Sequence, residues 1–456
     1  MAEGSEVTSL GEGDRPGPQP GSPRHRLKAR MGTGQSAASM LIRTSEIDAR
    51  FLGLIAALAI IWIGFNIASG GLFLSPENLW NLSVQSAAIA IMATGMVLII
   101  VSRNIDLSVG SMLGLTGYVM AMTQHVWLPT TLNLGFDQPY IWIVALAVGI
   151  LLGAAIGGLQ GFLVAYARVP SFVVTLGGLL IWRGLIFEIQ QGQTIAPLDS
   201  AFNTIGGGLP NGAIGGPQSW IVGGIACLAV VYAVFNSRRQ RRQFGFPAQP
   251  RWAMVGITGA VCAAILGAVW VANSYLWPVG LAHNYAVAHS IVEPAGGLQI
   301  PVGIAIPVLI MIAVALAMTF LTKRRQFGRY VFAIGGNPEA AQLAGINTRR
   351  TIMMTFVLMG VLCAVSGAVQ TARLGAGVTS LGTGDELAVI AAAVVGGTSF
   401  AGGVGTIPGA VLGAVVMQSL RSGMLLLGYD TPPQDIAVGA VLIAAIGFEN
   451  FLHRGR

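Results

Sequence analysis

Charged residues are scarce in this chain of 456 residues: Asp, Glu, Lys and Arg together make up 9%, whereas 54% of the residues are hydrophobic. Soluble domains carry about 25% charged residues, so this composition does not suit a globule surrounded by water. Apolar runs of about twenty residues, the length that crosses a bilayer, recur along the sequence. The composition therefore predicts an all-α polytopic membrane protein.

Lysine and cysteine are also rare. The two lysines, Lys28 and Lys323, do not belong to a GxxxxGK[ST] segment, so the sequence has no phosphate-binding loop of an ATPase. The three cysteines each fall inside an apolar run, which predicts neither a disulfide framework nor a cysteine metal site. No Ser/His/Asp or Cys/His set gathers on one predicted face, which argues against a hydrolase. We expect no catalytic residue, no metal site and no cofactor bound by the chain itself.

The net charge of +7 comes from basic residues in short segments beside the apolar runs. Segments 237–251 and 322–350 are rich in arginine, whereas 125–139, 191–218 and 273–301 contain no Lys or Arg. This alternation follows the positive-inside rule, which places both termini in the cytoplasm. The basic charge is therefore interpreted as orientation in the membrane, and no nucleic-acid partner is expected.

Twelve apolar runs predict about 10–12 transmembrane helices. The run at 386–402 is short, contains Gly396-Gly397 and ends at Gly402-Gly403, so it is a candidate for a broken or re-entrant helix. The runs are 51–69, 82–101, 107–124, 140–166, 172–190, 219–236, 252–272, 302–321, 351–372, 386–402, 405–427 and 434–452.

Residues 1–43 differ from the rest of the chain in being rich in Gly, Pro, Ser and charge. Such a segment cannot bury a core, so we expect a disordered cytoplasmic tail. It has no apolar central region, so it is not a cleavable signal peptide. Residues 44–456 would form the membrane domain.

The fourth apolar run repeats glycine at intervals of one helical turn, at Gly149, Gly153, Gly157 and Gly161. These glycines share one helix face and allow the backbone of another helix to approach closely. Two interpretations remain open: packing within the subunit, or the seam of a dimer.

A short polar stretch, from Asn337 to Gly345, lies between two apolar runs. Asn337 can cap the N-terminus of a helix, and Pro338 fits the first helical position, where no N–H is needed. Glu339 would lie near the positive end of the helix dipole, and Gly345 favours the left-handed backbone that ends a helix. The sequence predicts a short cytoplasmic helix over 338–344 that contacts another molecule.

Two acidic sites lie at the borders of apolar runs. Asp106, in the segment 105–111, is costly to bury in a membrane. Asp106 or Ser108 can cap the following helix, and such a cap is compatible with a role in coupling or gating. Asp385 and Glu386 precede the glycine-rich run in the same way and are candidates for the same path.

The fifth apolar run holds two ionisable residues, Arg183 and Glu188. They lie five positions apart, so they point in different directions on a regular helix and would not pair with each other. Each must face another helix, a water-filled path or the membrane rim, and both are candidates for lining a translocation path.

Three separated motifs resemble those of permeases from importers of the ATP-binding-cassette class. Glu339-Ala340-Ala341 is followed by three residues and Gly345, which is similar to the EAA-x3-G pattern of these permeases. The segments 105–111 (IDLSVGS) and 386–399 (ELAVIAAAVVGGTS) resemble the permeases for ribose, xylose and related monosaccharides. The length of the chain and the basic segment 237–251 make it more similar to the xylose branch.

The resemblance implies a homodimeric permease in a bacterial inner membrane, two cytoplasmic ATPase subunits that bind ATP-Mg, and an external sugar-binding protein. The resemblance covers about residues 51–452, within the predicted permease domain 44–456, and it implies that 338–344 is a coupling helix held by the ATPase. The residues expected at this contact are Asn337, Pro338, Glu339, Ala340, Ala341, Gln342, Leu343, Ala344 and Gly345.

Three alternatives remain open on the sequence alone. A self-sufficient secondary transporter would need ion-coupling carboxylates deep in the spans, for which Glu188 is the main candidate. A membrane enzyme would need a catalytic set, which the sequence does not display. The same importer class could instead carry a nucleoside or an amino acid.

Overall fold

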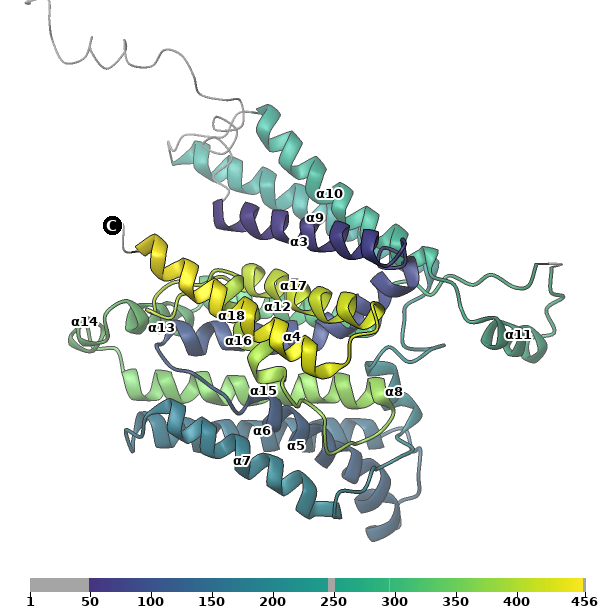
Figure 1. The fold of residues 1–456 in the computed structure, drawn as a ribbon, viewed down its shortest axis with the longest axis horizontal. Coiled ribbons are helices and arrows are strands. Elements are labelled where there is room, and N and C mark those ends of the chain that lie inside the picture. The colour runs from purple at the N-terminus through teal and green to yellow at the C-terminus, as the bar shows by residue number, and fades with distance from the viewer. Residues whose placement is uncertain (1–48, 245–250, 295, 454–456) are drawn as a thin grey trace, which may run out of the picture. The chain divides into compact units, whose positions relative to one another are not determined.

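A computed structural model describes residues 49–244, 251–294 and 296–453 (Figure 1). In these ranges all the regular secondary structure is helical, and β-structure is limited to isolated bridges. The all-α fold expected from the sequence is confirmed. The tail predicted at 1–43 lies outside the described residues.

Nine helices in the described ranges are long and apolar enough to cross a membrane. They are α3 (Ala49–Ala68), α4 (Pro76–Val101), α6 (Ile141–Ala165), α7 (Ser171–Gln190), α9 (Gly216–Gln243), α10 (Arg251–Ser274), α12 (Ile306–Arg324), α15 (Thr348–Leu374) and α17 (Ile407–Leu426).

The other three predicted runs also form helices, α5 (Val109–Met122), α16 (Asp385–Val395) and α18 (Thr431–His453). Helix α16 has 11 residues and is about 16 Å long, roughly half the thickness of the hydrocarbon core. A glycine-rich loop follows it, as expected for a broken segment. Helix α5 is shorter than the predicted run, and a π-helix, η1 (Thr123–Thr131), continues it.

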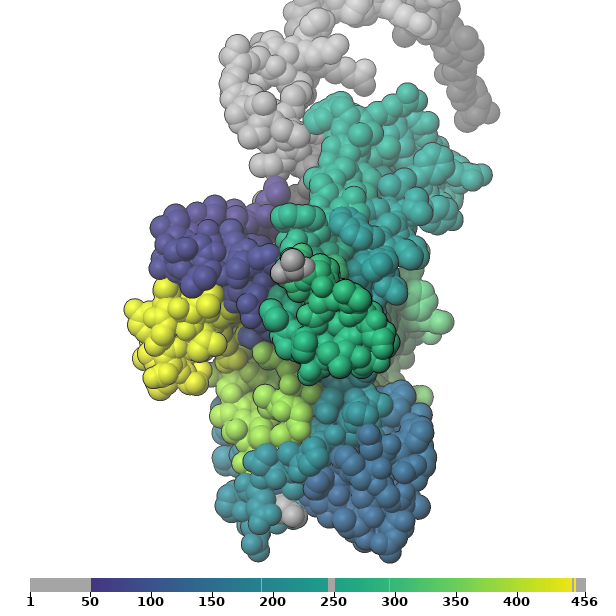
Figure 2. Space-filling model, turned by 90° about the vertical axis from the view of Figure 1, so that its right-hand side faces the viewer, coloured from purple at the N-terminus to yellow at the C-terminus, as the bar shows by residue number. Residues whose placement is uncertain are grey.

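Four short helices lie in the connections between the longer ones. Helices α13 (Gln326–Gly336) and α14 (Pro338–Leu343) lie at one end of the molecule's long helices, on the left in Figure 1. Helices α8 (Ser200–Ile205) and α11 (Val279–Ala288) lie at the other end. Figure 2 looks onto this second end, where the segment between α10 and α12 (green) lies toward the viewer.

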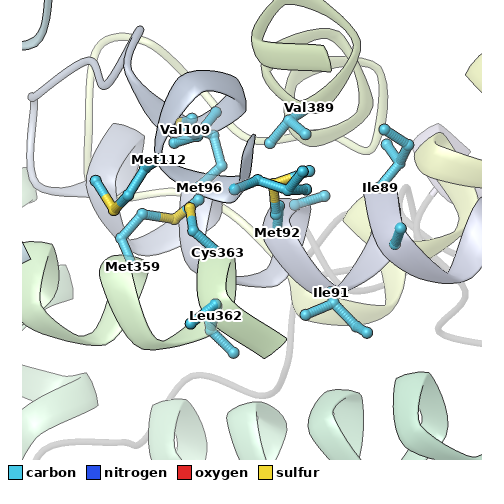
Figure 3. Close-up of a cluster of buried hydrophobic side chains, with 14 of the residues drawn as sticks. Ile89, Ile91, Met92, Met96, Val109, Met112, Met359, Leu362, Cys363 and Val389 are labelled. Carbon is cyan, nitrogen blue, oxygen red and sulfur yellow. The ribbon is translucent and has the colours of Figure 1, made fainter. Parts of the chain in front are cut away.

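The core forms around α4 and α5. All fourteen residues of α5 are buried, and α4 is buried almost throughout its second half. Figure 3 shows Met96 of α4, Met112 of α5, Met359 of α15 and Val389 of α16 meeting in one cluster. Flexible methionine side chains fill irregular spaces between helices, so they suit a core where several helices cross.

The glycine face of α6 packs against α15 of the same chain. A Cβ atom added at Gly153 would collide with the carbonyl oxygen of Gly360, and one added at Gly157 would collide with that of Phe356. Because the two backbones are in direct contact, no larger residue fits. Of the two interpretations of this glycine repeat, packing within the subunit is confirmed.

Candidate functional site

The predicted coupling helix is present as α14, with both ends formed as the sequence indicates. The side chain of Asn337 accepts a hydrogen bond from the N–H of Ala340 at 2.9 Å, and Pro338 occupies the first helical position. Gly345 has a φ of +82°, in the left-handed region that glycine adopts without strain. These caps are local interactions, which is why a sequence pattern was enough to predict them.

Helix α14 presents nearly all of its residues to the surroundings. Leu343 is 89% exposed. Ala341 is buried and fixes the helix to the rest of the fold. A helix that is capped at both ends and exposed on most of its residues is accessible to a partner molecule. The other exposed residues are Asn337, Pro338, Glu339, Ala340, Gln342, Ala344 and Gly345.

Helix α14 is held between two longer elements. Before it, α13 buries Val331 and Ile334. After it, Asn347 accepts a hydrogen bond from the N–H of Arg350 and so begins α15. Only a few residues separate α14 from either neighbour, so its position is coupled to both.

A junction of three chain segments lies behind the coupling helix. Arg103, just after α4, donates hydrogen bonds from Nε to the carbonyl of Gly335 at 2.8 Å and from Nη2 to that of Gly336 at 2.9 Å. The N–H of Gly403, in the loop after α16, donates to the carbonyl of Val101 at 3.0 Å. The ends of α4 and α13 and the loop after α16 therefore meet at one point. The guanidinium group also neutralises the partial negative charge at the end of α13.

Asp106 is fully buried beside the start of α5. Its Oδ1 accepts hydrogen bonds from the N–H of Ser108 at 2.9 Å and from the hydroxyl of Ser108 at 2.6 Å. Gln160 of α6 donates to the same hydroxyl at 2.9 Å. The predicted cap is thus displaced: Asp106 binds the residue before the helix, and Ser108 makes no side-chain cap. The second carboxylate oxygen, Oδ2, has no hydrogen-bond partner among the described residues.

Arg183 joins the loop that precedes α16. Its Nη1 donates to the carbonyl of Thr379 at 3.2 Å and to that of Leu381 at 2.8 Å. Glu386 lies in the first turn of α16, and its Oε2 is buried without a hydrogen-bond partner in the described ranges. Arg183 and Glu386 therefore gather at the same short helix, as their sequence positions alone could not indicate.

Glu188 does not join these groups. It is exposed near the end of α7, and no ion pair or hydrogen bond links its side chain to another described residue. Arg183 and Glu188 do not pair with each other, as expected from their spacing. The structure thus places Arg183 against the loop before α16 and Glu188 on the outside of α7.

Asp385 is held by two residues that the sequence interpretation did not single out. Its Oδ1 receives a hydrogen bond from Nη1 of Arg421 at 3.0 Å, and its Oδ2 receives one from Nε2 of Gln370 at 2.9 Å. Arg421 also donates to the carbonyl of Gly384 at 3.1 Å. The sequence did contain a signal for these two residues. Gln370 and Arg421 lie inside apolar runs, where a polar side chain usually has a polar partner.

The geometry defines a class: a polytopic helical membrane protein with a capped, exposed helix at one end and polar groups buried between its spans. A family model described as "Branched-chain amino acid transport system / permease component" matches residues 78–446. The chain belongs to this family. It is the membrane-spanning permease component of a transport system of the ATP-binding-cassette class, and so a transport subunit rather than an enzyme.

Several individual proteins are similar to the chain over most of their length. It is 38% identical to "Xylose transport system permease protein XylH" of Escherichia coli (strain K12), over 88% of this chain and 92% of that protein. The protein of the same name from Haemophilus influenzae (strain ATCC 51907 / DSM 11121 / KW20 / Rd) is 35% identical, over 89% and 97%. "Ribose import permease protein RbsC" of Escherichia coli (strain K12) is 30% identical, over 87% and 92%. No solved structure matches the chain.

Proposed function

We propose that the chain is the permease of an ATP-driven importer that carries a monosaccharide, with xylose as the substrate, delivered by an external binding protein. The support for a sugar is the printed function of the relatives, two of which are named for xylose and one for ribose. The higher identity to the xylose proteins, together with the basic segment 237–251 and its flanking helices, favours the pentose xylose.

The single observation that carries the mechanism is the exposure of α14. In the proposed mechanism two ATPase subunits each hold one coupling helix, and ATP-driven closure moves these helices. A ligand state can shift a conformational equilibrium only if it contacts the two conformations differently. The docked face around Leu343, which is 89% exposed in the isolated chain, supplies such a contact.

The proposed assembly is a dimer of this chain with two cytoplasmic ATPases in a bacterial inner membrane. ATP-Mg binds the ATPase and not the permease. Both termini face the cytoplasm in this proposal, because the arginine-rich segments then lie inside and the segments without Lys or Arg lie outside.

The coupling role is tested with Gly345→Leu. Leucine at a φ of +82° distorts the end of α14, and it adds bulk at the surface that docks. We expect uptake of labelled xylose by the reconstituted importer to fall at least tenfold, while the protein remains in the membrane and ATP hydrolysis continues. Glu339→Lys, which reverses the charge in the first turn, should have the same effect.

Gly428 provides a matched control for Gly345. It has a φ of +81°, and a Cβ atom meets no neighbour at either position, but Gly428 lies between α17 and α18. Gly428→Leu should carry the same backbone strain without loss of coupling. Equal uptake by the Gly345 and Gly428 variants would refute the coupling role. Uptake by the chain alone on an ion gradient would indicate a secondary transporter, and preferential uptake of a nucleoside or an amino acid would change the cargo.

A further inference from the structure

A polar cavity lies between four packed helices, α4, α15, α16 and α17. Its volume is about 180 Å³, which is room for about six water molecules. This is the scale of one monosaccharide ring rather than of an oligosaccharide. The remaining lining residues are apolar, and the polar ones are Gln85, Gln370, Arg373, Asp385, Gln418 and Arg421.

The polar groups of the cavity are fixed by one another. Nε2 of Gln418 donates to Oε1 of Gln85 at 2.6 Å, which joins α17 to α4. Asp385 is held by Gln370 and Arg421, which joins α16 to α15 and α17. Because each pair connects different helices, the arrangement depends on how the four helices pack. A shift of one helix would change the shape of the cavity.

Each of the three glutamines has an amide end that makes no hydrogen bond to another described residue. Each uses one end of its amide on a protein partner, and the other end of Gln85, Gln370 and Gln418 has no partner among the described residues. An amide offers a donor at one end and an acceptor at the other, and a sugar hydroxyl can both donate and accept. Glutamines around apolar walls thus match the hydroxyl groups and C–H faces of a neutral sugar.

The cavity lies toward the end of the spans that carries α8 and α11. Gln85 is in the first half of α4, Gln370 is in the last two turns of α15, and Asp385 is the first residue of α16. Trp80, one turn before Gln85, donates to the carbonyl of Gly303 in the connection between α11 and α12, which fixes the start of α4 at this end. The connections 191–218 and 273–301 at this end contain no Lys or Arg, so the positive-inside rule makes it the outer side.

From these observations we infer that the cavity is a transit site that holds one neutral monosaccharide after the external protein releases it. Nε2 of Gln85 would donate a hydrogen bond to the sugar, and Oε1 of Gln370 and of Gln418 would accept one each. This inference rests on the proposed function, since it concerns the sugar of that importer. The Asp385–Arg421 ion pair positions Gln370 and need not contact the sugar. Transport requires that the site bind weakly, and amide contacts to hydroxyls provide weak binding.

The test uses the complete importer in proteoliposomes, with permease, ATPase and xylose-loaded binding protein, and counts sugar delivered and ATP hydrolysed. Gln85→Met, Gln370→Met and Gln418→Met are made one at a time, because methionine keeps the length of the side chain and removes the amide. We expect the xylose delivered per ATP to fall about three- to tenfold in each variant, the effect of one lost neutral hydrogen bond. ATP hydrolysis stimulated by the loaded binding protein should stay within about twofold of the wild type.

The matched control is Gln434→Met. Gln434 also uses one end of its amide, on the carbonyl of Tyr429, but it lies on α18 and does not line the cavity. Deoxy analogues of xylose give a second readout: removing one hydroxyl should impair delivery by the wild type, and that impairment should shrink in one of the three variants. A change in folding would not produce this selective effect.

Two failures are distinguishable. If the wild type delivers xylose and all three variants match both the wild type and Gln434→Met in delivery and in discrimination of the analogues, the transit site is refuted. If the wild type hydrolyses ATP with the loaded binding protein but delivers no monosaccharide, the proposed function is refuted, and the transit site with it.

Discussion

Replacing Arg103 with alanine should weaken the link between the coupling helix and the buried core. The change removes two hydrogen bonds, at 2.8 and 2.9 Å, to the last carbonyls of α13. Hydrogen bonds from a charged donor contribute about 1.5–3 kcal/mol each when shielded from water, and about 1 kcal/mol each at an exposed site such as this one. The packing of α13 and α14 against the end of α4 should therefore lose about 2 kcal/mol. The equilibrium constant between the packed and the detached arrangement should change by about thirtyfold.

The assay compares xylose delivered per ATP hydrolysed by the reconstituted importer. We expect ATP hydrolysis to continue while delivery falls, because movement of α14 is no longer passed to the end of α4. Arg103→Lys should give an intermediate result, since an ammonium group lacks the planar fork that reaches both Gly335 and Gly336. Native gel analysis of the detergent-solubilised complex would show whether the ATPase is still bound.

Arg168 offers a matched control for this experiment. Both arginines are exposed and have positive φ, +63° for Arg103 and +58° for Arg168, so alanine meets similar backbone strain at each position. No hydrogen bond or ion pair joins the side chain of Arg168 to another described residue. Equal delivery per ATP by Arg103→Ala and Arg168→Ala would show that the junction does not transmit movement.

Two further predictions concern stability. Gly153→Ala should lower the apparent Tm in detergent by disturbing the contact with Gly360, at a cost of about 1–3 kcal/mol, whereas Gly158→Ala should not, because its Cβ meets no atom closer than 3.7 Å. Asp106→Ala should cost about 1–3 kcal/mol by leaving the N–H and hydroxyl of Ser108 unpaired, and Asp106→Asn should restore most of this because an acceptor remains. Thermal unfolding followed by size-exclusion chromatography checks both.

The parts of the fold that depend on local pattern were predictable. Among the described residues, the apolar runs located the nine long helices and also α5, α16 and α18, because a helix that crosses a membrane needs a continuous apolar stretch. The caps at Asn337 and Gly345 were also predictable, because each depends on residues within a few positions of it in the sequence. The short length of α16 followed from the Gly396-Gly397 pair directly after it.

The contacts between distant residues were not predictable from the pattern. Gln85 and Gln418 are separated by 333 positions, and only the packing of α4 against α17 brings their amides together. Arg103 lies 232 positions from Gly335, and its contact with the end of α13 depends on a backbone turn after α4. Arg183 and Glu188 looked equivalent in sequence, yet the direction of each side chain around α7 separates them.

Helix α15 has a consequence for how distant ends of the molecule communicate. It is a single unbroken rod of 27 residues, about 40 Å long, with its first turn next to α14 and its last turns carrying Gln370. If such a lever pivots about its middle by about 5°, each tip sweeps by about 2 Å, which exceeds the tolerance of a hydrogen bond. A small displacement at the end of α15 beside α14 would thus be enough to break a hydrogen bond of Gln370 at its other end.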